Sequence, residues 1–281
     1  MRTTMAGFLG AGRTGSSPAV VDLPRLLPGS RAPGVVEIVV VLGVSLGQSA
    51  VYSILRIIER LTRPVPLSQQ TSTLNASVTP DRPWLDLTYQ VVNIVFPLVP
   101  VLLALYLLTR VDRPAAEVTG PRLIGFDLRR PRIDLGFGAL IALGIGIPGL
   151  GLYLGARALG LNTTVQASAL GDQWWSVPVL IIAAAQNAVL EEVVMLGYLF
   201  TRLRQQGLHW AVVIIASALV RGSYHLYQGF GGFVGNAIMG VIFGLIFLRW
   251  RRVMPLVVAH TLLDVAAFVG YALVAPHVSW L

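Results

Sequence analysis

The chain has 281 residues, of which 55% are hydrophobic and 12% are charged, and its mean hydropathy is +0.72. Because a soluble domain carries about 25% charged residues, this composition excludes a water-soluble globule with an ordinary polar surface. The high hydrophobicity also excludes a disordered chain, so an integral membrane protein is the class that fits. The sequence contains no cysteine, which rules out a disulfide framework and a thiolate site.

The net charge of +8 comes from 21 basic residues, all of them arginine, against 13 acidic ones. A basic balance can indicate binding to nucleic acid, but these arginines lie in short clusters between apolar runs. Such clusters are typical of the cytoplasmic ends of membrane helices. We therefore expect the lipid bilayer, and no nucleic acid, among the partners of the chain.

Seven apolar runs are each long enough to cross a bilayer, which takes about 20 residues. The sequence therefore predicts an all-α fold, a polytopic transmembrane helical bundle of about seven spans with a range of six to eight, in which every element is a helix. The runs cover 35–57, 86–109, 135–158, 177–200, 209–227, 230–249 and 253–275. The predicted domains are a mobile cytoplasmic tail over 1–34 and a transmembrane helical domain over 35–281.

The arginines alternate between the two ends of the predicted spans. The tail and the second, fourth and sixth loops contain clustered arginines, whereas the third loop, around 162–175, has none. The positive-inside rule then places the N-terminus in the cytoplasm and the C-terminus outside. We expect an integral membrane protein of the bacterial plasma membrane.

Small residues are spaced along the predicted sixth span at intervals that suit close helix packing. Gly231 and Gly235 form one such pair, and Gly240 and Gly244 form another. Glycines four residues apart let the backbones of neighbouring membrane helices approach closely. We expect the backbone of the sixth span to lie close to those of neighbouring helices.

Ionisable residues gather in the second half of the chain, inside apolar runs. A charged side chain at the middle of a bilayer costs at least about 2.5–3.5 kcal/mol, so each of them calls for a reason. They are Glu191, Glu192, Arg221, His225, His260 and Asp264. A functional site is the default interpretation of such residues.

Glu191 and Glu192 are adjacent on the predicted fourth span. Neighbouring residues of a helix point about 100° apart. One carboxylate can therefore face a cavity while the other bonds to a neighbouring helix. The alternative is a pair that only forms a salt bridge with Arg221.

Two histidines lie on separate spans. His225 follows Arg221 at i+4, and His260 precedes Asp264 by four residues, so the carboxylate can orient the imidazole. The alternative is a pair of hydrogen-bonded core histidines. Asn236, on the sixth span, can donate to an oxyanion or simply bond to a neighbouring helix.

The depth of these residues sets a geometric condition. Counted from the basic loop after the fourth span at 1.5 Å per residue, His225 lies about 20–25 Å along its helix and Glu191 about 15 Å along its own. The two side chains meet only if the fifth helix starts in the cytoplasm, if it tilts strongly, or if the spans are shorter than predicted.

The acid and imidazole groups allow two mechanisms, between which the sequence does not choose. Two histidines and a carboxylate with an open position resemble a catalytic zinc site, with Glu191, His225 and His260 as ligands of a divalent metal. Without a metal, glutamate and histidine can activate water directly. Both mechanisms lead to hydrolysis inside a membrane cavity, and peptide bonds are the expected target.

The order of these residues resembles that of the CPBP family, the CAAX proteases and bacteriocin-processing enzymes. The family pattern has Glu-Glu-x-x-x-Arg on one helix, Phe-x-x-x-His on the next and His-x-x-x-Asn or Asp on a later one. The residues that match are Glu191, Glu192, His225, His260 and Asp264, together with Asn236 at the polar position of the intervening helix. The resemblance covers about residues 177–270, and the stretch from Arg221 to Gln228 resembles an actinobacterial branch of the family.

The resemblance implies a membrane-embedded endopeptidase, of metallo- or glutamate type, that acts on membrane-tethered peptides or proteins. It implies that Glu191 activates the attacking water with help from His225. His260 and Asp264 stabilise the oxyanion or complete a metal site, and Glu192 supports the network. The substrate and the cleavage site stay open.

Two positions depart from the family pattern. Leu196 stands where the family has arginine, and Arg221 stands where it has phenylalanine. Our hypothesis is that Arg221 supplies the positive charge that is missing at position 196.

Two other functions compete with a protease. A non-catalytic membrane protein of the same fold would act as an immunity factor or a scaffold, and the leucine at position 196 favours that alternative. A transporter would use the buried carboxylates to carry protons or cations, but the sequence shows no internal repeat that supports it.

Overall fold

The computed structural model describes residues 34–110 and 119–277, so the tail predicted over 1–34 lies outside the described residues apart from Gly34. Within this part of the chain six helical runs are long and apolar enough to cross a membrane. They are Val35–Leu61, Pro83–Thr109, Pro131–Ala158, Ser176–Gln205, Phe230–Trp250 and Met254–Val274. The protein is a helical integral membrane protein, as the sequence predicts.

Three of the six runs are built from shorter segments. The first joins α1 (Val35–Leu42), a π-helical segment (Gly43–Gly47) and α2 (Gln48–Leu61). The second joins α3 (Pro83–Val95) and α4 (Leu98–Thr109), and the fourth joins α7 (Ser176–Glu192), a π-helical segment (Val193–Leu199) and α8 (Phe200–Gln205). The remaining helices are α5 (Gly120–Leu123), α6 (Pro131–Ala158), α9 (Trp210–His225), α10 (Phe230–Trp250) and α11 (Met254–Val274).

The fifth predicted span, 209–227, is shorter than the other spans. Its helix, α9, has 16 residues and passes into a 3-10 turn, Leu226–Gln228. At 1.5 Å per residue α9 is about 24 Å long, somewhat less than the ~30 Å hydrocarbon core of a bilayer. The helix ends here because Gly229 has φ 116 and ψ 178, a conformation outside the helical region.

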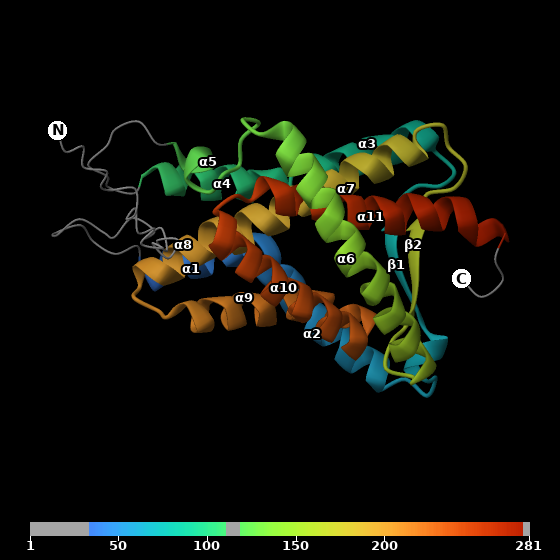
Figure 1. The fold of residues 1–281 in the computed structure, drawn as a ribbon. Coiled ribbons are helices and arrows are strands. Elements are labelled where there is room, and N and C mark those ends of the chain that lie inside the picture. The colour runs from blue at the N-terminus through green and yellow to red at the C-terminus, as the bar shows by residue number, and fades with distance from the viewer. Residues whose placement is uncertain (1–33, 111–118, 278–281) are drawn as a thin grey trace, which may run out of the picture.

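Two short strands contradict the expectation that every element is a helix. β1 (Thr71–Ala76) and β2 (Thr164–Ala169) form a parallel pair in which Thr71 lies opposite Thr164 and Ala76 opposite Ala169. They belong to the loops after the first and third spans. Figure 1 shows them beside α11 at one end of the bundle, with α5 and α8 toward the other end.

The loops meet at two opposite ends of the bundle, so consecutive spans alternate in direction. At the sheet end, Asn162 forms an isolated bridge with Gly229 after α9. At the other end, Val253 N donates to Ile124 O at 2.8 Å, which joins the second loop to the turn between α10 and α11. The alternation makes α9 a crossing segment in spite of its length.

An ion-pair cluster fixes the turn between α10 and α11. Arg252 donates to Asp134 Oδ2 at 2.6 Å and to Asp127 Oδ1 at 3.1 Å. Burial on its own raises the pKa of Asp127, but the hydrogen bonds from Arg252 and from the backbone of Arg129, together with the charges of both arginines, lower that pKa below its usual value. The cluster therefore holds the second loop against the start of α11.

The glycines of α10 allow the close approach predicted for them. A Cβ at Gly240 would lie 3.0 Å from Ala218 Cα on α9, and one at Gly231 would lie 2.4 Å from Ala156 Cβ on α6. Larger side chains at these positions would push α10 away from both helices. The expectation of close packing by the sixth span is confirmed.

The fourth span is longer than predicted, and this change removes the conflict of depth between Glu191 and His225. The helix continues to Gln205, which puts Glu191 14 residues, or about 21 Å, from that end. His225 lies 15 residues, or about 22 Å, from Trp210 at the start of α9. The two residues are therefore at similar depth without a strong tilt of α9.

Candidate active site

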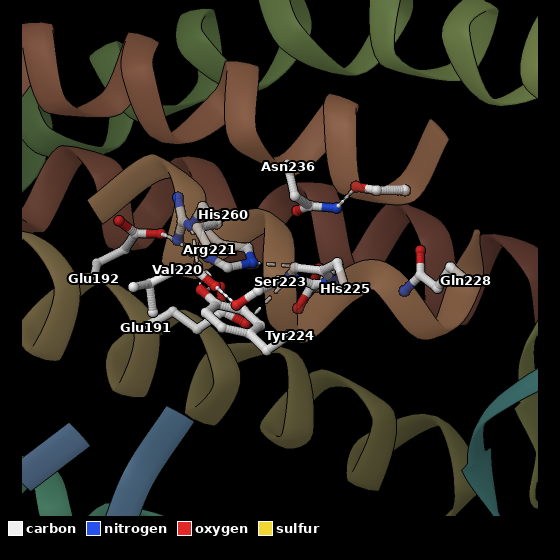
Figure 2. Close-up of polar contacts among 12 residues, drawn as sticks. Glu191, Glu192, Val220, Arg221, Ser223, Tyr224, His225, Gln228, Asn236 and His260 are labelled. Atoms are coloured by element: carbon white, nitrogen blue, oxygen red, sulfur yellow. Dashed lines mark hydrogen bonds and ion pairs between the residues drawn. The ribbon is translucent and has the colours of Figure 1, made fainter. Parts of the chain in front are cut away.

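Arg221 lies at the centre of a buried polar cluster formed by α7, α9 and α11. Its Nη2 donates to Glu191 Oε2 at 3.1 Å and also to Glu192 Oε1, and its side chain is 2% exposed. The guanidinium lies 5.4 Å from the centre of the Phe243 ring of α10. Figure 2 shows Arg221 close to both carboxylates. The arginine from α9 thus pairs with both carboxylates of α7, as the relocation hypothesis requires, while Leu196 is buried in the hydrophobic core.

The two carboxylates have different surroundings, as expected for adjacent residues of a helix. Glu192 is fully buried, and its Oε1 also bonds to His260 Nδ1 at 2.8 Å. Glu191 has a side chain that is 10% exposed, and its Oε2 accepts a hydrogen bond of 2.7 Å from the Tyr224 hydroxyl. The other oxygen, Glu191 Oε1, faces His225. Only Glu191 of the pair is accessible from outside the cluster.

His225 completes the accessible side of the site. Its Nε2 lies 3.8 Å from Glu191 Oε1, which is too far for a direct hydrogen bond. Both ring nitrogens are buried and have no hydrogen-bond partner. Because a buried polar atom without a partner is costly, the space between Glu191 and His225 suits a bridging water or a polar group of a substrate.

His260 and Asp264 extend the cluster along α11. His260 is 3% exposed, and its Nε2 lies 3.6 Å from Asp264 Oδ1 while its Nδ1 bonds to Glu192. The imidazole is therefore held between two carboxylates. The Asp264 side chain is 21% exposed, so it borders the accessible side together with His225.

Asn236 lies apart from the carboxylates. Its Nδ2 donates to Gly232 O on the same helix at 3.0 Å, as Figure 2 shows. This contact within one helix is neither of the two expected for Asn236, which were donation to an oxyanion and a bond to a neighbouring helix. Its role in the site stays a prediction.

Tyr224 is the member of the cluster that the sequence did not single out. It is 5% exposed, accepts from Arg221 Nε at 3.3 Å and donates to Glu191. Its position three residues after Arg221 places both side chains on one side of α9. This spacing is the one sequence feature that links Tyr224 to the cluster, but tyrosines that only pack against other helices often have the same spacing.

A metal ion needs ligand atoms that converge and are free to bind it. Among the described residues, Glu191, Glu192 and His260 offer ligand atoms within 4.8 Å of one another, so Glu192 takes the place that the sequence predicted for His225. One oxygen of each carboxylate and His260 Nδ1 bond instead within a network that includes Arg221, and Glu192 Oε2 is the buried atom that has no hydrogen-bond partner among these three residues. Because a guanidinium stays charged in a protein, it fills the position between the carboxylates that a cation would take. In this arrangement the residues do not fit a metal centre.

Comparison with known proteins identifies the region that carries the site. Residues 173–266 match the family model of the type II CAAX prenyl endopeptidases, Rce1-like. No curated protein and no solved structure matches the chain. The matched range begins just before α7, includes every residue of the cluster described above, and agrees with the resemblance to CPBP proteases. The comparison therefore finds an Rce1-like domain at residues 173–266, which is consistent with a protease of the CPBP family.

Proposed function

We propose that the chain is an intramembrane endopeptidase that hydrolyses peptide bonds with a water activated by Glu191 and His225. The observation that carries the proposal is the gap between Glu191 Oε1 and the unpartnered Nε2 of His225, which are 3.8 Å apart. A water in this gap can bond to both atoms. The other oxygen of Glu191 is held by Arg221 and Tyr224, so the carboxylate has a fixed orientation toward the water.

In the proposed hydrolysis, Glu191 carries one proton from the attacking water to the leaving nitrogen. The water loses a proton to Glu191 while its oxygen forms a bond to the carbonyl carbon of the peptide. When the C–N bond breaks, the Glu191 carboxyl returns that proton to the leaving nitrogen. Glu191 ends as a carboxylate, and the products are a carboxylic acid and an amine. His225 assists by orienting the water.

We propose that this hydrolysis proceeds without a metal, and Arg221 is the reason. Its guanidinium already supplies positive charge between the two carboxylates. We assign His260, which is tied to Glu192 and Asp264, to holding Glu192 in place. Glu192 in turn holds Arg221 against Glu191.

We propose membrane-tethered peptides or proteins as substrates, because the site lies about 21 Å from the Gln205 end of its span, within the bilayer. A substrate anchored in the membrane stays at this depth, whereas a soluble peptide has to leave water. The sequence family supports the same class of substrate, since residues 173–266 match endopeptidases of prenylated proteins.

The experiment that tests the proposal is turnover of lipid-anchored, quenched fluorescent peptides by the purified protein in liposomes. The control is the double variant Glu191→Gln with His225→Gln, which lacks both groups that face the water. We expect cleavage by the wild type, with products identified by mass spectrometry, and only background signal from the variant. Equal signal from both proteins would leave the non-catalytic alternative.

A second arm of this assay tests the metal-free mechanism. We expect the wild-type rate to persist after exhaustive treatment with a chelator, in protein whose metal content is measured on the same sample. A rate that is lost on chelation and restored by a divalent metal such as zinc would contradict the mechanism.

We propose in addition that the N-terminus lies in the cytoplasm of the bacterial plasma membrane. The end of the bundle that carries Arg129, Arg204 and Arg252 is richer in arginine than the sheet end, and cytoplasmic loops carry such an excess. A reporter fused after residue 127 should therefore show cytoplasmic activity. Activity of an exported reporter at the same position would reverse the orientation.

A further inference from the structure

The turn that follows His225 has an unusual backbone. After the 3-10 turn Leu226–Gln228, Gly229 has φ 116 and ψ 178, a combination that is essentially restricted to glycine. A Cβ at this position would lie 2.5 Å from Leu161 O. The turn therefore has its shape only in close contact with the segment before β2.

Three buried hydroxyls hydrogen-bond to the backbone of this turn. Ser53 Oγ of α2 accepts from Tyr227 N at 2.6 Å, and Ser72 Oγ of β1 lies 3.1 Å from Tyr227 O. Thr163, just before β2, donates to Gln228 O from its amide and from its Oγ1, each at 3.0 Å. The turn is thus held from two loops and one helix.

The two hydroxyls of Ser72 and Thr163 also contact each other, with 2.8 Å between their oxygens. Each hydroxyl has one proton, so the pair can make two of its three possible hydrogen bonds at a time. Whichever two of the three form, each hydroxyl still donates one hydrogen bond. The pair therefore acts as one unit against the turn.

The same segment holds the start of α10. Asn162 Oδ1 accepts from Gly232 N at 3.2 Å, and Leu161 O accepts from Phe230 N at 2.9 Å. The first amides of a helix have no partner within the helix. Asn162 and Leu161 supply partners for two of them, which fixes the direction in which the chain leaves the turn.

These polar residues are buried as deeply as the carboxylate pair. Ser53 is 2% exposed, Ser72 and Asn162 are each 1% exposed, and Thr163 is fully buried. All four lie outside residues 173–266, in the part of the chain that the family model does not match. A buried hydroxyl or amide is costly unless it is hydrogen-bonded, and here most of the partners belong to the turn after His225.

His225 depends on its backbone more than His260 does. The His260 ring is held by a hydrogen bond to Glu192, whereas the His225 ring has no hydrogen-bond partner. The distance between the His225 ring and Glu191 is therefore set by where the end of α9 lies. The hydroxyls that hold the turn fix that end.

We infer that Ser53, Ser72 and Thr163 are positioning residues that hold the His225 imidazole at its working distance from Glu191. The inference rests on the proposed function for its effect on catalysis. It also assigns a role to the N-terminal spans, which supply α2 and the loop with β1. These residues do not touch the reacting atoms and act through the backbone of the turn.

The test compares two substitutions at one position. Thr163→Val removes the hydroxyl but keeps the shape of the side chain, and Thr163→Ser keeps the hydroxyl. Thr73→Val is the matched control, because Thr73 lies on β1 and bonds to Gln166 instead of the turn. We expect Thr163→Val to lower kcat about tenfold, the effect of one lost buried hydrogen bond, with KM unchanged. Thr163→Ser and Thr73→Val should retain the wild-type kcat.

A second measurement does not depend on turnover. Nuclear magnetic resonance of isotope-labelled histidine side chains reports the surroundings of the His225 ring, whose signal is assigned by its loss in His225→Gln. We expect Thr163→Val to change the chemical shift of the His225 ring and to leave that of His260 in place. If no peptide is cleaved by the wild type, the proposed function fails while this measurement still decides the inference.

Three results would overturn the inference. One is a chemical shift of the His225 ring in Thr163→Val that equals the wild type, another is an equal change in Thr73→Val, and the third is a change in KM alone. If Thr163→Val does not fold in detergent, Ser72→Ala replaces it, because that variant removes the other hydroxyl of the unit. The same three results then apply to Ser72→Ala.

Discussion

Glu191→Gln is expected to lower peptide turnover by about 10²–10⁴-fold, the usual contribution of a general base, while the protein stays folded. Glutamine has the shape of glutamate, and its oxygen can still accept from Arg221 and Tyr224, but it cannot take a proton from water. Its amide can donate to His225 Nε2, the atom that faces Glu191 in the wild type. The loss should therefore be mainly in kcat, measured in the liposome assay, with a smaller fall in melting temperature than in Glu192→Gln, because the Glu191 side chain is 10% exposed whereas that of Glu192 is fully buried.

Glu192→Gln is the matched variant, because it makes the same chemical change one residue away. Glu192 is fully buried and bonds to Arg221 and His260. Removing its charge leaves a buried guanidinium with one carboxylate fewer, a type of change that costs about 3–5 kcal/mol. We expect a lower melting temperature as its main effect. Equal losses of turnover with equal melting temperatures in the two variants would contradict the division of roles.

The sequence predicted those features of the site that follow from helix geometry and from the cost of buried charge. Glu191 and Glu192 were expected to point in different directions, and His260 to lie beside Asp264, because helical spacing determines both. The helices themselves follow from the length of the apolar runs. These predictions need only local sequence, and the structure agrees with them.

Other features depend on contacts between distant segments, which the sequence does not reveal. β1 and β2 are six residues each and lack a long alternating pattern, and they pair only because the first and third loops meet. The fourth span continues past its predicted end at residue 200 and includes Arg202, an arginine of the predicted fourth loop. In the structure it is buried and forms an ion pair of 2.9 Å with Glu37 of α1, which lets the helix continue to Gln205.

The turn after His225 was missed for a related reason. Ser53, Ser72 and Thr163 are ordinary polar residues in the sequence, and their meaning comes from being buried together at one place. Tyr224 is a similar case, because a tyrosine in an apolar helix is usually a packing residue. Patterns within single helices predicted the carboxylates and imidazoles of the site, but the residues that we propose to orient them come from several elements.

Arg221→Phe is expected to destabilise the protein by about 3–5 kcal/mol, since it leaves two buried carboxylates without their cation. Turnover should fall with it, because Glu191 loses the guanidinium that orients Oε2. Phenylalanine is the residue that the CPBP pattern has at this position, so the variant restores the family side chain while removing the charge. Chemical unfolding in detergent and the liposome assay measure the two effects.

Adding Leu196→Arg to Arg221→Phe tests whether the charge has moved between helices. An arginine four residues after Glu192 is at a spacing that favours contact with a carboxylate on the same helix. We expect the double variant to recover stability and turnover relative to Arg221→Phe. Leu199→Arg in the same background is the control, because Leu199 is equally buried in the same π-helical segment but stands at another position of the pattern. If Arg221→Phe alone is fully active and the double variant is inactive, the guanidinium of α9 does not replace the missing arginine of α7.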